Sequence, residues 1–352
     1  MIDLVKIRRY LHQNPELGFQ EFNTQQYIIN ILKDYRCEIK TIGTGIIAFF
    51  DNHQKSTLVY RCEMDALNIK EETNVVYKSK NEYMHACGHD GHMAIAIGLC
   101  DYLNNHYKFK ENIAILFQPS EECFGGSLSI IESNILDQIK VSKIIAIHFF
   151  PKLEKNKFYT SKVIFSSARE IDIELISKNI HVANKNNLPD PILIGTKLVN
   201  KICTLSNNHH LIHFGVIKGG ETRNSLASSC VLHGTIRSNK NDVKLIKKIK
   251  NIINTYKKRY RINIKYDISK YLPMIKNDTK LLSNAQRFIN LTVLNKTFLQ
   301  GEDFSLFCEK YPSLYLLYGI GEQNYLHTSN FNFDEDILYS CLNKVISLLS
   351  LY

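Results

Sequence analysis

The chain has 352 residues, of which 44% are hydrophobic and 22% charged, so it can bury the cores of two domains and is neither disordered nor collagen-like. Its net charge of +10 arises from lysines spread along the whole chain, which predicts no nucleic-acid partner. It contains no apolar run of about 18 residues, and its charged start lacks the apolar core of a signal peptide. We therefore expect no membrane partner.

The nine cysteines follow no paired spacing, and their odd number favours reduced thiols over disulfides. Reduced thiols are typical of the cytoplasm, where we expect the protein. They also leave cysteine free to bind a metal ion.

The first half of the chain alternates helices with short apolar runs. Asp3 can cap a first helix, and apolar residues repeat at helical spacing in two opening segments, namely Leu4, Ile7 and Leu11, then Ile28, Ile31, Leu32 and Tyr35. Apolar runs follow at 45–50, 56–62, 112–118 and 143–149, with a helix at about 92–104. Runs that are apolar on both faces and alternate with helices predict an α/β fold with a mainly parallel sheet.

The pattern changes near Ser166, where apolar and polar residues begin to alternate as in a strand with one wet face. The predicted order is then a strand (169–177), a helix (190–204), two strands (209–217 and 228–237), a helix (242–259) and a strand (261–268). This βαββαβ order is the ferredoxin-like plan.

The helix and strand alternation resumes after Pro273, with helices near 279–290, after Glu302-Asp303 and from about 334, and a strand at 314–319. We therefore predict a larger α/β domain formed by residues 1–165 and 274–352. The ferredoxin-like domain, residues 166–273, is inserted into it.

The densest cluster of ligand-type side chains is the run from His85 to His92, which contains three histidines, Cys87 and Asp90. Imidazole and thiolate are natural ligands of zinc and similar transition metals. The two glycines in the run let the backbone turn tightly enough to aim several side chains at one point. The run therefore predicts a metal site.

Further candidates follow predicted strands: Glu121-Glu122, His148 and His327. Because the carboxyl ends of strands line the ligand crevice of an open α/β sheet, we expect these residues to converge with the histidine-rich run. A bound divalent metal lowers the pKa of its water, and a nearby carboxylate is then needed to take the proton. Two adjacent glutamates suit a ligand and a base, and spacing alone leaves open which is which.

These segments resemble the M20 metallopeptidase family, in particular its amidohydrolase branch of hippurate hydrolases, N-acyl-amino-acid amidohydrolases and auxin-conjugate hydrolases. The matching segments, in family order, include RRYLHQNPELGFQE, RCEMDALNIKEE, YMHACGHDGHMAIAIG, ILFQPSEECFGG, IHFFP, GVIKGGETRNSLASS, GEDFSLF and LHTSNFNFDEDIL. The resemblance implies a metal-bearing α/β catalytic domain interrupted by a βαββαβ lid and dimerisation domain. It also implies a homodimer.

Carried over by position, the resemblance implies that one or two divalent metal ions are bound by Cys87, His89, Glu122, His148 and His327. Zinc or manganese is expected, with cobalt or nickel as further options. Glu121 would be the general base. Asp65 matches an aspartate that orients a group on the metal side.

The resemblance also assigns roles to three residues of the inserted domain. His181 matches a histidine that stabilises the oxyanion, usually in the site of the opposite subunit. Asn224 and Arg237 match positions that hold the substrate's carboxylate, for which a forked guanidinium is well suited. The chain departs from the family pattern at Ile180, which replaces a glycine, and at 185–186, which replaces Pro-His.

The implied function is hydrolysis of the amide bond of an N-acyl amino acid, a small-molecule substrate, by a metal-activated water. Alternatives within the family are a dipeptidase or carboxypeptidase, or a deacetylase of an acetylated diaminopimelate-type compound. A non-catalytic metal-binding or ligand-binding relative is the alternative from another class.

Overall fold

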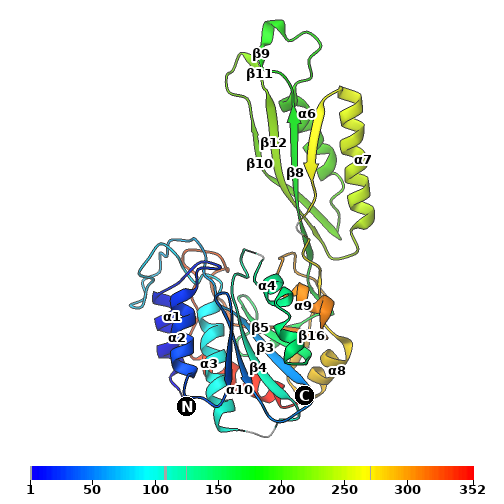
Figure 1. The fold of residues 1–352 in the computed structure, drawn as a ribbon. Helices are drawn as coiled ribbons and strands as arrows, with labels where there is room; N and C mark the ends of the chain where they lie inside the picture. The colour runs from blue at the N-terminus through cyan, green and yellow to red at the C-terminus, as the bar shows by residue number, and fades with distance from the viewer. Residues whose placement is uncertain (1, 107–108, 124, 270) are drawn as a thin grey trace. The chain divides into compact units, whose positions relative to one another are not determined.

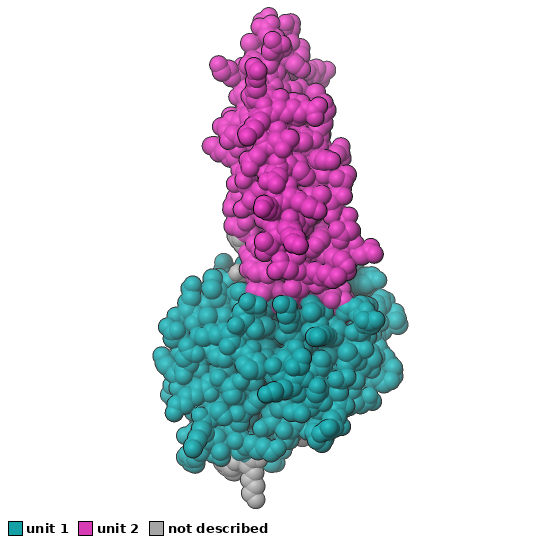
Figure 2. All heavy atoms as spheres, turned by 90° about the vertical axis from the view of Figure 1, so that its right-hand side faces the viewer, with its two compact units in different colours: residues 1–164, 275–296, 302–352 teal, residues 165–274, 297–301 magenta. Residues whose placement is uncertain are grey.

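The structure, a computed structural model, describes residues 2–106, 109–123, 125–269 and 271–352. The chain forms two compact units, coloured separately in Figure 2. Unit 1 consists of Met1–Ile164, Ile275–Lys296 and Glu302–Tyr352, and unit 2 of Phe165–Met274 and Thr297–Gly301. In sequence, the smaller unit is thus inserted into the larger one.

Unit 1 is built on an eight-stranded mixed sheet (Figure 1). Its four middle strands are mutually parallel, as the two-sided apolar runs predicted, and antiparallel strands flank them. In spatial order the strands are β1 (Glu38–Ile42), β2 (Gly45–Phe50), β4 (Asn112–Gln118), β3 (Thr57–Glu63), β5 (Val141–Phe150), β16 (Ser313–Gly319), β6 (Phe158–Thr160) and β15 (Leu291–Val293).

Helices cover both faces of this sheet (Figure 1). One face packs into a continuous apolar core against α1 (Leu4–Gln13), α2 (Phe22–Leu32), α3 (His89–Asn105), α8 (Thr279–Phe288) and α10 (Ile337–Leu349). The shorter helices α4 (Gly126–Glu132), α5 (Ile135–Gln138) and α9 (Ser305–Lys310) complete the unit. Asp3 caps α1 as predicted, because its side chain accepts a hydrogen bond from the Lys6 N–H.

Some helix boundaries differ from those predicted, and several short strands were not predicted. Tyr35 was expected in the second helix, but α2 ends at Leu32 and the chain turns toward β1. Helix α3 begins at His89, three residues earlier than expected. Strands β1, β6 and β15, which lie at or next to the sheet edges, were not predicted, since strands this short carry little hydrophobic pattern. The same holds for β7 (Val163–Phe165) and β14 (Ile275–Lys276), which pair with each other.

Unit 2 has the predicted βαββαβ order. It consists of β8 (Ser167–Ile176), α6 (Pro191–Cys203), β10 (His210–Gly219), β12 (Ser229–Ser238), α7 (Val243–Tyr260) and β13 (Asn263–Asp267). The strands form an antiparallel sheet in the order β10-β12-β8-β13, and both helices pack against its apolar core. A two-stranded ribbon of β9 (Ile180–His181) and β11 (Ser225–Leu226) lies at one end of that sheet, with a 3-10 turn at Val182–Asn184 (Figure 1).

Within the described ranges, none of the helices combines the length and the hydrophobicity that crossing a membrane requires.

Candidate metal centre

Three segments that carry candidate ligands contain a residue with left-handed backbone. Gly88, between Cys87 and His89, has φ +84°, while Ser120, just before the glutamate pair, has φ +50°. His327 itself has φ +61°, and its N–H bonds the carbonyl of Ala86 at 2.9 Å. Non-glycine residues rarely adopt this conformation, so the surrounding contacts must hold Ser120 and His327 in it. These turns aim the ligand side chains.

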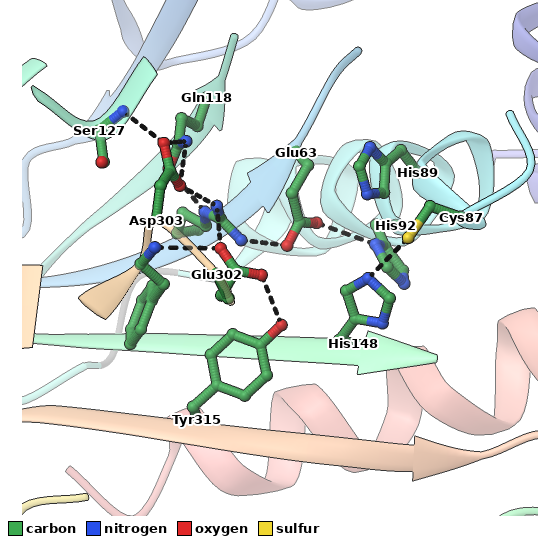
Figure 3. A network of polar contacts seen from close by, with 12 residues as sticks. Glu63, Cys87, His89, His92, Gln118, Ser127, His148, Glu302, Asp303 and Tyr315 are labelled. Atoms are coloured by element: carbon green, nitrogen blue, oxygen red, sulfur yellow. Dashed lines mark hydrogen bonds and ion pairs between the residues drawn. The ribbon is translucent and has the colours of Figure 1, made fainter. Parts of the chain in front are cut away.

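The side chains of Cys87, His148, His327 and Glu122 converge at one end of the sheet. The Cys87 Sγ lies 3.4 Å from the His148 Nε2 and 3.3 Å from the His327 Nε2. The His327 Nε2 lies 3.2 Å from the Glu122 Oε1. His89 joins the same group, because its ligand atom lies within 4.8 Å of those of Cys87 and His148, and in turn of both glutamates. Figure 3 shows Cys87, His89 and His148 pointing toward one another.

The hydrogen bonds of His89 and His148 fix which ring nitrogen faces this centre. The His89 Nδ1 lies 2.8 Å from the Asp65 carbonyl, and the His148 Nδ1 lies 2.7 Å from the Phe149 carbonyl. Because a carbonyl can only accept, both Nδ1 atoms carry a proton, and in the neutral form of each ring the Nε2 has the lone pair. This is the tautomer that a metal-binding imidazole needs.

The donor set fits a divalent transition metal. The His89 Nε2 is buried and has no hydrogen-bond partner among the described residues, which is costly unless something binds it. One thiolate, three imidazoles and a carboxylate are ligand types that zinc and similar ions accept. Cys87, His89, Glu122, His148 and His327 would hold such an ion.

The electrostatics of the centre also favour a cation. Burial lowers the pKa of His89, but its bond to Asp65 and the charge of Glu63 outweigh this and raise the pKa to about 10. Surroundings that favour a proton on the Nε2 also favour a metal ion there. Burial, together with the Glu122 and Glu121 charges, raises the pKa of Cys87 well above its ordinary value. The sulfur therefore becomes a thiolate only when a cation compensates the charge.

Glu121 lies beside this group, among several other carboxylates. Its carboxylate oxygens lie within 4.8 Å of ligand atoms of His89 and Glu122 on one side, and of Glu302 and Asp303 on another. Burial, followed by the Glu302 and Glu122 charges, raises its pKa well above its usual range.

Asp65 contacts two of the ligand segments. Its Oδ2 accepts the N–H of Glu122 at 2.9 Å, and its Oδ1 lies 3.4 Å from the His89 Nδ1. It thus contacts the backbone of Glu122 and the ring of His89.

A buried ion network that was not predicted from the sequence lies beside the centre (Figure 3). The Arg61 side chain is fully buried and bonds to Glu63, to Glu302 at 2.9 Å and to Asp303 at 3.0 Å. Gln118 bonds both Arg61 and Asp303. The sequence did contain a sign of this network, namely an arginine and a glutamate within the apolar run of β3. Charged groups in a buried strand need partners.

Two of the three candidate residues of unit 2 lie together, and the third lies apart from them. His181 and Asn224 are exposed and adjacent, since β9 pairs with β11 and the Val182 N–H bonds the Asn224 carbonyl at 2.9 Å. Arg237 lies on β12, half-buried, and its Nη1 has no hydrogen-bond partner within the described residues.

The strand register separates these residues by most of the length of the sheet. Arg237 pairs with Ala168 of β8, whereas the β9/β11 ribbon follows Ile176 and precedes Ser229, which pair at the opposite end. Eight residues of strand separate Ala168 from Ile176, roughly 26 Å at 3.3 Å per residue. Asn224 and Arg237 of one chain therefore cannot hold the same carboxylate.

The chain is similar to known proteins in sequence and in structure. The sequence profile of the family described as peptidase family M20/M25/M40 matches residues 59–350. N-acetyldiaminopimelate deacetylases of Bacillus velezensis and Bacillus subtilis are each 32% identical to the chain, over 99% of this chain and 98% of each relative. A crystal structure of the Bacillus subtilis YXEP protein, a dinuclear metal-binding peptidase from the M20 family, is 26% identical, with a TM-score of 0.87 over 99% of this chain and 96% of that chain.

Proposed function

Because the chain belongs to peptidase family M20/M25/M40, we propose that it removes the acyl group from an N-acylated amino acid by hydrolysing the amide bond. The chain is an enzyme, a metal-dependent amidohydrolase. The observation that carries the proposal is the convergence of five ligand-type side chains and a further carboxylate in unit 1.

We favour a short N-acyl group on an amino acid as the substrate, and an N-acetylated diaminopimelate-type compound as the first to test. Two relatives that match the chain over nearly its whole length carry the name N-acetyldiaminopimelate deacetylase. The dipeptidase and carboxypeptidase alternatives use the same metal ligands, so the substrate panel below has to separate them.

We assign the metal ligands as Cys87, His89, Glu122, His148 and His327. A divalent ion, zinc or manganese first, held by them would supply a Lewis acid for the amide carbonyl and would favour deprotonation of water. The thiolate makes zinc or another thiophilic ion suitable.

Within this assignment, Glu121 acts as the general base. Its carboxylate takes a proton from the attacking water and delivers it to the nitrogen of the leaving amine. Glu122 serves as the ligand, because its backbone is fixed by Asp65 and its Oε1 faces the His327 Nε2. Asp65 orients both His89 and Glu122.

In unit 2, we assign His181 to the oxyanion and Asn224 and Arg237 to the substrate's carboxylate. The Arg237 Nη1, which has no hydrogen-bond partner in the described part of the chain, suits an anionic ligand. Because Arg237 lies at the opposite end of the unit 2 sheet from the other two, one substrate meets all three only if two copies of the chain contribute. This supports a homodimer.

Subunit complementation tests the shared site. We expect Arg237→Ala and His181→Ala to be nearly inactive as separate homodimers, and activity to return when the two variants are mixed and exchange subunits. Mixtures that stay as inactive as their components would contradict the assignment of the residues to two copies.

We also propose that the protein is cytoplasmic. All nine cysteines are free thiols, which suits a reducing compartment.

The function is tested by a panel of N-acetyl, N-benzoyl and dipeptide substrates, with the metal-loaded protein and with Glu121→Gln. We expect the wild type to hydrolyse N-acetyl amino acids, and the variant to keep its metal while losing about 10²–10⁴-fold in kcat. A wild type that is as inert as Glu121→Gln on the whole panel would favour a non-catalytic binding protein.

A further inference from the structure

We propose that Glu63 and His92 are positioning residues that fix the ligand His148 through the backbone of Phe149. The inference rests on the metal-ligand role proposed for His148. Both side chains are buried and contact neighbours of the metal centre.

The need for such a contact arises at the end of β5. On one side, β5 pairs with β3 only as far as Ala146, opposite Arg61. On the other side, it remains paired with β16 through Phe150. The last residues of β5, which include His148, therefore lack a strand partner on the β3 side. A buried backbone N–H there needs an acceptor from elsewhere.

His92 supplies that acceptor. Its Nε2 lies 3.0 Å from the backbone nitrogen of Phe149, and its Nδ1 lies 2.9 Å from the Glu63 Oε2. Because a backbone N–H can only donate, the His92 Nε2 must accept, and the Nδ1 carries the proton that Glu63 accepts. Glu63 thus selects the only neutral tautomer that can bond Phe149.

The same two hydrogen bonds distinguish His92 from the proposed metal ligands. Ligand atoms of Glu63, His89 and His92 lie within 4.8 Å of one another, so the three could form a metal site by distance alone. However, both ring nitrogens of His92 are already used, whereas the His89 Nε2 has no partner among the described residues. His92 therefore acts on the centre indirectly, through the backbone of Phe149, and not as a ligand.

Packing and charge hold this support in place. The His92 ring meets the rings of His148 and Phe149 edge-on, with centroids 4.6 and 4.7 Å away. Glu63 is held from the other side by the Arg61 guanidinium, which is itself fixed by Glu302 and Asp303 (Figure 3). The chain of contacts from Arg61 through Glu63 and His92 ends at the residue next to His148.

Two substitutions of His92 distinguish a side chain that can still bond the Phe149 N–H from one that cannot. In His92→Gln, the side-chain amide reaches the position of the Nε2 and can still accept from Phe149. In His92→Asn, the amide reaches only the position of the Nδ1, so the Phe149 N–H loses its partner. The two variants are compared for zinc affinity, by competition with a chromophoric chelator, and for the visible spectrum of the cobalt-substituted protein. Urea unfolding of the metal-free forms reports stability separately.

We expect His92→Asn to bind zinc about 10–100-fold more weakly than wild type, and His92→Gln to stay close to wild type. The cobalt spectrum of His92→Gln should match that of wild type, because no ligand has changed. Equal affinity in both variants and wild type would overturn the inference. So would equal weakening of both with altered cobalt spectra, which would make His92 itself a ligand.

A second measurement covers the case in which His92→Asn does not fold. Imidazole 15N shifts of the metal-loaded wild type should show His92 protonated at Nδ1, and protonation at Nε2 would overturn the inference. These readouts do not involve hydrolysis. An inactive wild type that binds zinc as described would therefore contradict the proposed function alone, whereas a wild type that binds no metal would contradict both.

Discussion

The two units treat their polar side chains in opposite ways. In unit 1, the candidate site is a buried network in which most members contact at least one other member, and in which Arg61, Glu63 and Asp303 are almost fully inaccessible. In unit 2, His181 and Asn224 lie on an exposed ribbon and only Arg237 is partly buried. Buried charges persist only when their partners are in place, so unit 1 specifies its site within one chain. The sites proposed in unit 2 need a second molecule.

The largest difference between the units is expected when one charged side chain is removed from each. Arg61→Met leaves three buried carboxylates without their cation, and we expect it to lower the free energy of unfolding by about 3–5 kcal/mol. The measurement is urea unfolding, followed by hydrogen exchange in peptides from each unit so that the two transitions are not merged.

The matched control is Lys265→Met in unit 2. The Lys265 Nζ lies 3.9 Å from the Glu174 Oε2, and both side chains are in contact with solvent, so we expect a loss of at most about 1 kcal/mol. If the two variants lose equal stability, the buried network does not hold unit 1 together.

Added volume gives a smaller test of the same contrast. A Cβ at Gly91, in α3, would lie 2.6 Å from a ring carbon of Phe149 and 2.7 Å from one of Phe333. Gly91→Ala should therefore cost about 1–3 kcal/mol. In unit 2, a Cβ at Gly215 would meet only the His213 ring, at 4.0 Å, so Gly215→Ala should stay within about 0.5 kcal/mol. Thermal unfolding of both variants measures the two effects. A Gly91→Ala variant as stable as wild type would show that the Phe149 and Phe333 rings can move to make room for the added methyl group.

The smallest expected effect is a difference in pH dependence. Burial lowers the pKa of His12 in unit 1, but its hydrogen bonds with Asp90 and Glu71 outweigh burial and leave the pKa raised, with Arg8 opposing. The stability that His12 contributes is therefore present below pH 6.5 and is lost as the pH rises through its folded pKa. The free energy of unfolding of wild type minus that of His12→Gln should shrink as the pH rises above 6.5.

His210 in unit 2 should show the opposite slope. Burial, with help from His209, lowers its pKa. The stability of wild type relative to His210→Gln should therefore fall as the pH drops below 6.5. Slopes of the same sign at the two positions would contradict the difference between the units. Urea unfolding at several pH values measures both.

Much of the fold and of the ligand convergence followed from the sequence, because both depend on local patterns. Two-sided apolar runs predicted the parallel strands, and ligand types at strand ends predicted that the Glu121-Glu122 pair, His148 and His327 would meet the run that contains Cys87. The roles of Arg61 and Glu63 could not be predicted, because they depend on Glu302 and Asp303, some 240 residues away in sequence. The separation of Asn224 from Arg237 depends on strand register, which spacing alone does not reveal.

The central claim is that Cys87, His89, Glu122, His148 and His327 share a divalent metal centre. X-ray absorption at the metal edge of the zinc-loaded protein tests it most directly. We predict a sulfur scatterer at about 2.3 Å together with nitrogen or oxygen scatterers at about 2.0–2.2 Å, and loss of the sulfur signal in Cys87→Ala. A spectrum with no sulfur ligand, or one unchanged in Cys87→Ala, would contradict the claim.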